Sequence, residues 1–73
     1  MGRLRVLSGK EVCTILIHHG FIEARRRGSH IVMQKRLSEG TITVPVADHK
    51  EIRIGTLLSI IRQSGINRTE FES

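Results

Sequence analysis

The sequence predicts a small α+β domain in which two helices pack on one face of a three-stranded antiparallel sheet. Two amphipathic helical patterns lie toward the ends of the chain, and the residues between them have the composition and alternation of strands. Glycines stand between these segments, where they favour turns. In this α-β-β-β-α order both helices can cover one face of the sheet and leave the other exposed to solvent.

The first helix is expected at residues 9–19. Ser8 and Glu11 have the spacing of a capping box, which satisfies free backbone donors at the start of a helix. Gly20 is placed to end the helix, because glycine readily adopts the left-handed conformation that follows the last helical turn. Phe21 then follows as the apolar residue of a Schellman motif.

Three strands are expected between the helices. Residues 21–27 and 29–36 have no helical apolar period and are separated by Gly28, so we interpret them as a β-hairpin. Residues 41–44 alternate polar and apolar side chains, which is typical of a half-buried strand. Pro45 favours an edge or strand-terminal position because proline has no backbone donor.

The second helix is expected at residues 54–64, where apolar residues recur at helical spacing before Gly65. After it, Asn67 and Glu70 have capping-box spacing, which predicts a short final turn of helix. No internal repeat or linker divides the sequence. Residues 1–73 are therefore interpreted as one domain.

The charge balance predicts a polyanionic partner. With 12 Lys and Arg against 7 Asp and Glu, the chain has a formal net charge of +5. Such an excess favours RNA, DNA, anionic lipid or an acidic protein surface. The single cysteine cannot form an intramolecular disulfide, which fits a reducing cytoplasm. No apolar run is long enough to span a membrane, so we expect a cytoplasmic protein without membrane association.

The most concentrated chemical signal is the run Arg25-Arg26-Arg27-Gly28-Ser29-His30. Three guanidinium groups suited to bidentate phosphate contacts stand beside a turn and a histidine. One hypothesis is that the arginines hold an RNA backbone while His30 transfers protons in phosphodiester cleavage, with the RNA 2′-hydroxyl as nucleophile. The alternative is a solvated charge run followed by an ordinary strand histidine.

Other polar residues could extend such a site. His49, in the loop after the third strand, is either solvent-exposed or a second proton donor or phosphate ligand. His18 and His19 are adjacent on a helix and do not share the face that a zinc pair uses, so no metal site is expected. Cys13 lies in an apolar stretch of the first helix and is expected in the core. The residues expected to contact RNA are Arg25, Arg26, Arg27, Ser29 and Lys35.

Six short motifs in a fixed order carry a resemblance to a known family. They are Ser8-Gly9-Lys10-Glu11, Gly20-Phe21, Gly28-Ser29-His30, Thr43-Val44-Pro45-Val46, Gly55-Thr56-Leu57 and Ile61-Arg62-Gln63-Ser64-Gly65. From about residue 7 to residue 71 the chain resembles the HicA-type toxins of HicA/HicB toxin–antitoxin systems. The resemblance implies an α-β-β-β-α fold similar to the double-stranded RNA-binding domain, in agreement with the element order expected above.

The resemblance also implies a function. HicA-type toxins are mRNA interferases whose essential histidine lies in the Gly-Ser-His motif, which is His30 here. It implies a HicB-type antitoxin as protein partner. On chemical grounds, a lone histidine fits a metal-independent endoribonuclease without a cofactor. On physical grounds, Gly28 would supply the turn and Ser29 would orient the histidine. Many relatives carry a second histidine directly after the Val-Pro-Val strand, where this chain has Ala47, and His49 follows two positions later.

Two other functions fit the same residues. A non-catalytic RNA-binding module would use the same fold and basic surface, and its affinity would fall steeply with salt but would not depend on His30. Alternatively, the basic face could serve mainly to dock an acidic partner protein, with any RNA affinity incidental.

Overall fold

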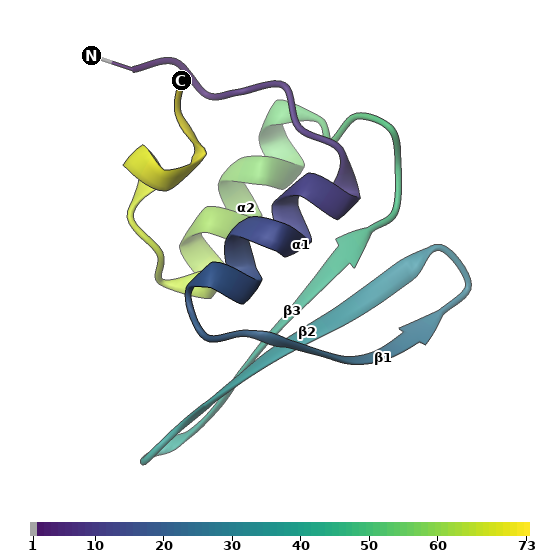
Figure 1. Cartoon of the computed structure of the whole chain (residues 1–73), viewed down its shortest axis with the longest axis vertical. Helices are drawn as coiled ribbons and strands as arrows, with labels where there is room; N and C mark the ends of the chain where they lie inside the picture. The colour runs from purple at the N-terminus through teal and green to yellow at the C-terminus, as the bar shows by residue number, and fades with distance from the viewer. Residues whose placement is uncertain (1) are drawn as a thin grey trace.

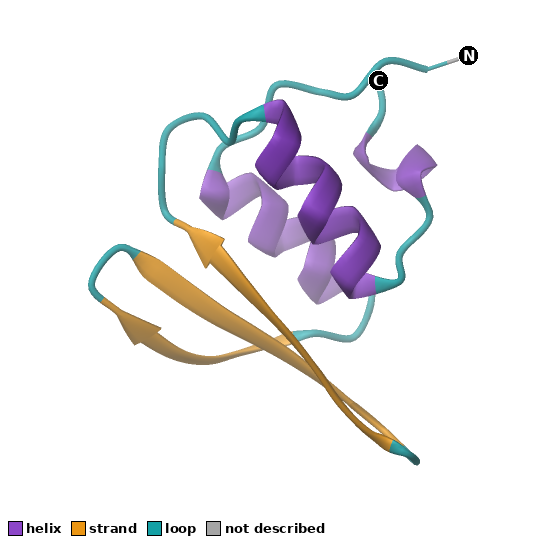
Figure 2. Cartoon of the chain, turned by 180° about the vertical axis from the view of Figure 1, so that it is seen from behind, coloured by secondary structure: helices purple, strands orange, loops and turns teal. Residues whose placement is uncertain are grey.

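The structure is a computed structural model that describes residues 2–73. Its elements are α1 (Gly9–His18), β1 (Ile22–Arg27), β2 (His30–Leu37), β3 (Gly40–Ala47), α2 (Ile54–Ser64) and a short 3-10 helix, η1 (Arg68–Phe71). The strands form one antiparallel sheet in the order β1-β2-β3. Both helices pack on the same face of this sheet, and within residues 2–73 no element covers the other face (Figures 1 and 2). The predicted α+β fold is thus confirmed.

α1 begins and ends with the signals that the sequence predicts. The Ser8 hydroxyl accepts a hydrogen bond from the Glu11 amide at 3.1 Å, and the Glu11 carboxylate accepts one from the Ser8 amide at 2.9 Å, which completes the capping box. At the other end, the amides of Gly20 and Phe21 donate to carbonyls of the last turn, and Gly20 has a φ of 93°. The helix itself stops one residue before the predicted boundary, because His19 is already the C-cap.

The strands differ slightly from their predicted bounds. A two-residue turn, Gly28 and Ser29, joins β1 to β2, so β2 begins at His30. Gly28 has a φ of 56°, the left-handed conformation that favours glycine. β3 extends through Pro45 to Ala47, because β3 is an edge strand in which a missing backbone donor is tolerated.

The core lies between the sheet and the helices. Ile31 and Met33 of β2 and Val44 and Val46 of β3 face it, each at most 2% exposed. The other core side chains are Leu7, Val12, Cys13, Leu16, Phe21, Ile52, Leu57, Ile60, Ile66 and Phe71. Cys13 is therefore confirmed as a core residue, and its burial raises the pKa of its thiol.

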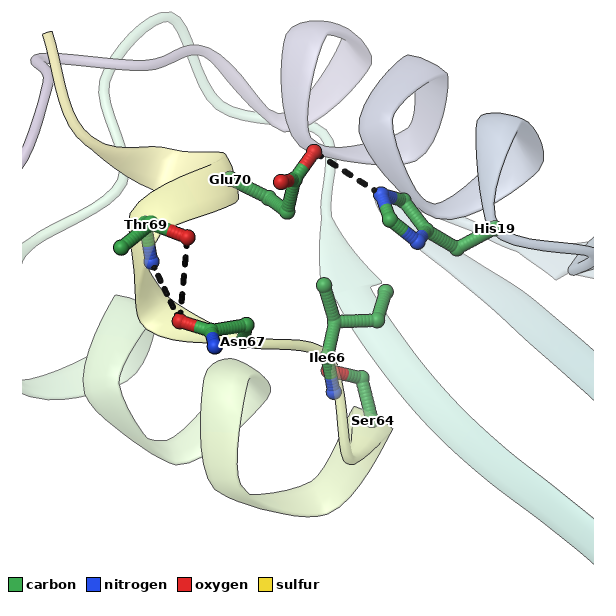
Figure 3. A network of polar contacts seen from close by, with 6 residues as sticks. All are labelled: His19, Ser64, Ile66, Asn67, Thr69 and Glu70. Atoms are coloured by element: carbon green, nitrogen blue, oxygen red, sulfur yellow. Dashed lines mark hydrogen bonds and ion pairs between the residues drawn. The ribbon is translucent and has the colours of Figure 1, made fainter.

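The C-terminal segment is tied to the start of the chain and to α1. The Asn67 side chain accepts a hydrogen bond from the Thr69 amide at 3.0 Å, which caps η1. The predicted capping box between Asn67 and Glu70 is wrong, because the Glu70 carboxylate instead lies 3.1 Å from Nε2 of His19 at the end of α1 (Figure 3). The backbone of residues 71–73 pairs with that of residues 3–5. Within residues 2–73, no helix combines the length and apolar character that crossing a membrane requires.

Candidate functional site

The uncovered face of the sheet carries three of the predicted site residues. Residues paired directly across antiparallel strands point to the same face of a sheet. Arg27 is paired with His30, and Arg25 with Val32 two positions along β2. Ile31, between His30 and Val32, points into the core. Arg25, Arg27 and His30 therefore share the opposite face, where all three are exposed to solvent.

The pairing of Arg27 with His30 places two complementary groups at one position. The Cβ atoms of directly paired residues lie about 4.5–5.5 Å apart, so both side chains can reach one phosphate group. A guanidinium donates two parallel hydrogen bonds to phosphate oxygens, whereas an imidazole gives up or accepts a proton near neutral pH. This pair can thus bind a phosphodiester and move a proton at the same place.

Arg26 points to the opposite face of β1 from Arg25 and Arg27. It is paired with the core residue Ile31, and its guanidinium donates a hydrogen bond to the Asp48 carboxylate at 2.9 Å. This bond holds the pKa of Asp48 below its usual range and raises the pKa of Arg26. The structure therefore divides the run of three arginines, and it does not bring Arg26 together with His30.

The turn that precedes His30 is held by the loop after β3. The Ser29 carbonyl accepts a hydrogen bond from the Asp48 amide at 2.6 Å. Asp48 directly follows Ala47, which is paired with His30 at the end of β3. Ser29, exposed and adjacent to His30, and Gly28 thus lie at the same end of the sheet as the loop that begins at Asp48.

Lys35 lies away from this cluster. Its position on β2 is five residues from His30, which corresponds to roughly 16 Å along a strand and to the opposite face of the sheet. Its ammonium is 6.0 Å from the centre of the ring of Phe21 and lies on the helix side. The structure does not bring Lys35 together with His30.

His49 is exposed in the loop after β3, two residues beyond the partner of His30. Its carbonyl accepts a hydrogen bond from the Gly9 amide at 2.8 Å, which fixes this part of the loop against the start of α1. A shallow hollow opens beside it, lined by Ala47, His49, Glu51, Ile52, Arg53 and Thr56. His49 is therefore placed at the same end of the sheet as His30.

The part of the chain that the structure describes supports neither a metal site nor a phenylalanine surface for base stacking. Residues 2–73 hold no group of three or more His, Cys, Asp or Glu side chains arranged to bind a metal ion. The two aromatic residues of the sequence, Phe21 and Phe71, are 1% and 0% exposed, so they offer no ring on which a base can stack. Neither phenylalanine ring therefore provides a stacking surface on the sheet face.

Asp48 is the residue of this region that sequence reasoning missed. Nothing in its local sequence distinguishes it from the polar loop residues around it, and its partner Arg26 is 22 positions away. The signal that the sequence did offer is an acidic residue directly after the third strand, which lies near the run of arginines in the folded sheet. It becomes informative only once the register of the strands is known.

A comparison with protein families places the chain in a known family. The family model described as HicA toxin of bacterial toxin-antitoxin matches residues 9–66. The matched segment contains α1, the whole sheet and α2, and it includes every candidate site residue from Arg25 to His49. No curated protein gives a significant match to the chain.

Proposed function

The chain belongs to the HicA toxin family of bacterial toxin–antitoxin systems, and from this premise we propose that it is a metal-independent endoribonuclease that cuts mRNA with His30. The observation that carries the proposal is the pairing of His30 with Arg27 on the uncovered, solvent-exposed face of the sheet. Because the proposed substrate is mRNA, the proposed place of action is the cytoplasm.

The chemistry follows from what RNA and these side chains supply. The 2′-hydroxyl of the substrate attacks the adjacent phosphorus, and the bond from phosphorus to the 5′-oxygen of the next nucleotide breaks. His30 transfers a proton, either from the attacking hydroxyl or to the leaving oxygen. Arg27 and Arg25 donate hydrogen bonds to the non-bridging oxygens, whose negative charge grows in the transition state. The products are a 2′,3′-cyclic phosphate and a 5′-hydroxyl.

Three further residues have supporting roles in this proposal. Gly28 supplies the left-handed position of the turn, and the exposed Ser29 hydroxyl lies next to His30, where it can orient the histidine or contact the RNA. His49, at the same end of the sheet, is proposed as a second proton donor or phosphate ligand. A HicB-type antitoxin is proposed to inhibit the toxin by covering this face, with acidic side chains against Arg25 and Arg27.

The ends of the RNA products test the proposed chemistry. We expect the purified chain to cut a labelled RNA in the presence of EDTA and to leave a 2′,3′-cyclic phosphate and a 5′-hydroxyl. A mock preparation from cells without the chain controls for contaminating nucleases. Products with a 3′-hydroxyl, or loss of cutting in EDTA, would contradict the mechanism. RNA binding without cutting would identify the non-catalytic module instead.

The arginines that share the face of His30 should dominate RNA affinity. We expect the double variant Arg25→Gln with Arg27→Gln to bind RNA more weakly and with a lower salt dependence. For single-stranded RNA, each lost phosphate contact reduces the slope of log affinity against log salt by about 0.7. Binding can be measured by fluorescence anisotropy on RNA with 2′-O-methyl groups, which cannot supply the nucleophile.

The matched control for this pair is Arg3→Gln with Arg5→Gln. Both arginines are exposed in the N-terminal segment, which pairs with the C-terminal end of the chain, and their replacement removes the same total charge. We expect this control to keep most of the affinity. Equal losses in the two double variants would show that net charge, and not the sheet face, governs binding.

A further inference from the structure

We propose that Asp48 is a positioning residue that fixes the β1–β2 turn, and with it His30, for RNA cleavage. This inference rests on the proposed function of His30. It goes beyond that function because Asp48 does not act on the RNA in the proposed chemistry. Its role is to hold His30 in position.

Asp48 makes one contact on each side of the turn. Its backbone amide donates to the carbonyl of Ser29 at 2.6 Å, immediately before His30. Its carboxylate accepts a hydrogen bond from Nη1 of Arg26 at 2.9 Å, immediately before Arg27. A single residue thus contacts the end of β1 and the start of β2, and the two positions that it contacts adjoin Arg27 and His30.

Beyond the strand pairing of His30 with Arg27 and Ala47, the turn itself has few contacts. Arg27, Gly28, Ser29 and His30 are all exposed, and no heavy atom lies within 4 Å of the place where a side chain on Gly28 would begin. An exposed hairpin end without apolar contacts opens at low free-energy cost unless other bonds restrain it. The two bonds from Asp48 therefore add to the strand pairing in restraining the turn that positions His30.

Asp48 is itself attached to a rigid part of the fold. The next residue, His49, accepts a hydrogen bond from Gly9 at 2.8 Å, and a side chain on Gly9 would overlap the carbonyl of Ala47, so α1 begins in direct contact with this loop. The Asp48 side chain is 22% exposed, which limits the competition of water for its bond to Arg26. The bond from Arg26 lowers the pKa of the Asp48 carboxylate, and the bond is charge-assisted.

The replacement Asp48→Asn tests the role, because electrostatics and positioning predict opposite changes in the cleavage rate. It removes a negative charge near the proposed RNA site, so electrostatics alone would strengthen RNA binding and speed cleavage. If Asp48 positions His30, kcat should fall instead, by about tenfold or more, because a catalytic group displaced by about 1 Å can lose about 100-fold in rate. Binding to 2′-O-methyl RNA should be unchanged or tighter.

Two further variants separate positioning from general effects. The charge-reversed double variant Arg26→Asp with Asp48→Arg restores the ion pair in the opposite direction and should recover most of the kcat that each single change loses. Glu39→Gln removes an acidic charge from the exposed turn at the far end of the sheet and should keep the kcat of the wild type. An unchanged kcat in Asp48→Asn, or an equal loss in Glu39→Gln, would overturn the proposal.

A measurement that needs no catalysis distinguishes this inference from the proposed function. In NMR relaxation, the amides of residues 28–30 should have order parameters near about 0.85 in the wild type and lower ones in Asp48→Asn, which loses the charge-assisted bond to Arg26. Unchanged order together with normal cutting would overturn the positioning role alone. A wild type that cuts no RNA would overturn the proposed function and the catalytic part of this role, even if the turn loosens as expected.

Discussion

Replacing His30 by alanine is expected to abolish RNA cutting and to leave the fold intact. A lost proton-transfer group lowers the rate by about 10²–10⁴-fold, which leaves little cleavage to detect. The His30 side chain is exposed on the uncovered face of the sheet, so its removal takes no apolar contact from the core. Single-turnover cleavage of a labelled RNA measures the rate, and circular dichroism with thermal unfolding checks the fold.

His18→Ala is the matched control, because His18 is an exposed histidine at the end of α1. It should cut like the wild type. In cells, induced wild type and His18→Ala should arrest growth and produce new RNA ends, whereas His30→Ala should do neither. If His30→Ala cuts as fast as the wild type, the catalytic assignment is wrong.

His49→Ala separates two possible mechanisms. If His49 is the second proton-transfer group or a phosphate ligand, its removal also lowers the cleavage rate. If it is only a solvated loop residue, the rate stays that of the wild type. The comparison of His30→Ala with His49→Ala therefore assigns the number of histidines that the reaction uses.

The helices could be predicted well because their signals are local. The capping box of Ser8 and Glu11 and the glycine at position 20 act within one turn of α1, and the structure reproduces each of them. The bounds of α2 agree with the prediction for the same reason. The short helix predicted after Asn67 is present and Asn67 caps it. Glu70 does not complete the capping box, because it has a competing partner in His19, which is 51 residues away and is not detectable by local reasoning.

The candidate site could be predicted only in part because it depends on strand register. A hairpin with the two-residue turn Gly28-Ser29 pairs Arg27 with His30 and so sends Arg26 to the other face. A shift of one residue would exchange these faces, and the sequence run alone does not fix the turn length. The sequence could have predicted that Lys35 and His30 point to opposite faces of the sheet. The two residues are an odd number of positions apart on one strand, where side chains alternate between faces.

Phe71→Ala is expected to remove most of the stability of the fold, although Phe71 lies outside the segment that matches the toxin family. Phe71 is 0% exposed and belongs to the same core as α1 and the sheet. Truncating a buried phenylalanine costs about 3–5 kcal/mol, and the total stability of a small domain is about 5 kcal/mol. Urea unfolding followed by circular dichroism should show a large fall in the midpoint and a substantial unfolded fraction in water.

Ile17→Ala is the control for this prediction, because Ile17 is an apolar residue of α1 that is 53% exposed. Its replacement should change the free energy of unfolding by less than about 0.5 kcal/mol. A wild-type midpoint for Phe71→Ala would mean that the C-terminal segment does not contribute to the core in solution. A large fall in the urea midpoint would show that the C-terminal segment belongs to the folding unit. The family match ends at residue 66, but the core includes Phe71, which comes after it.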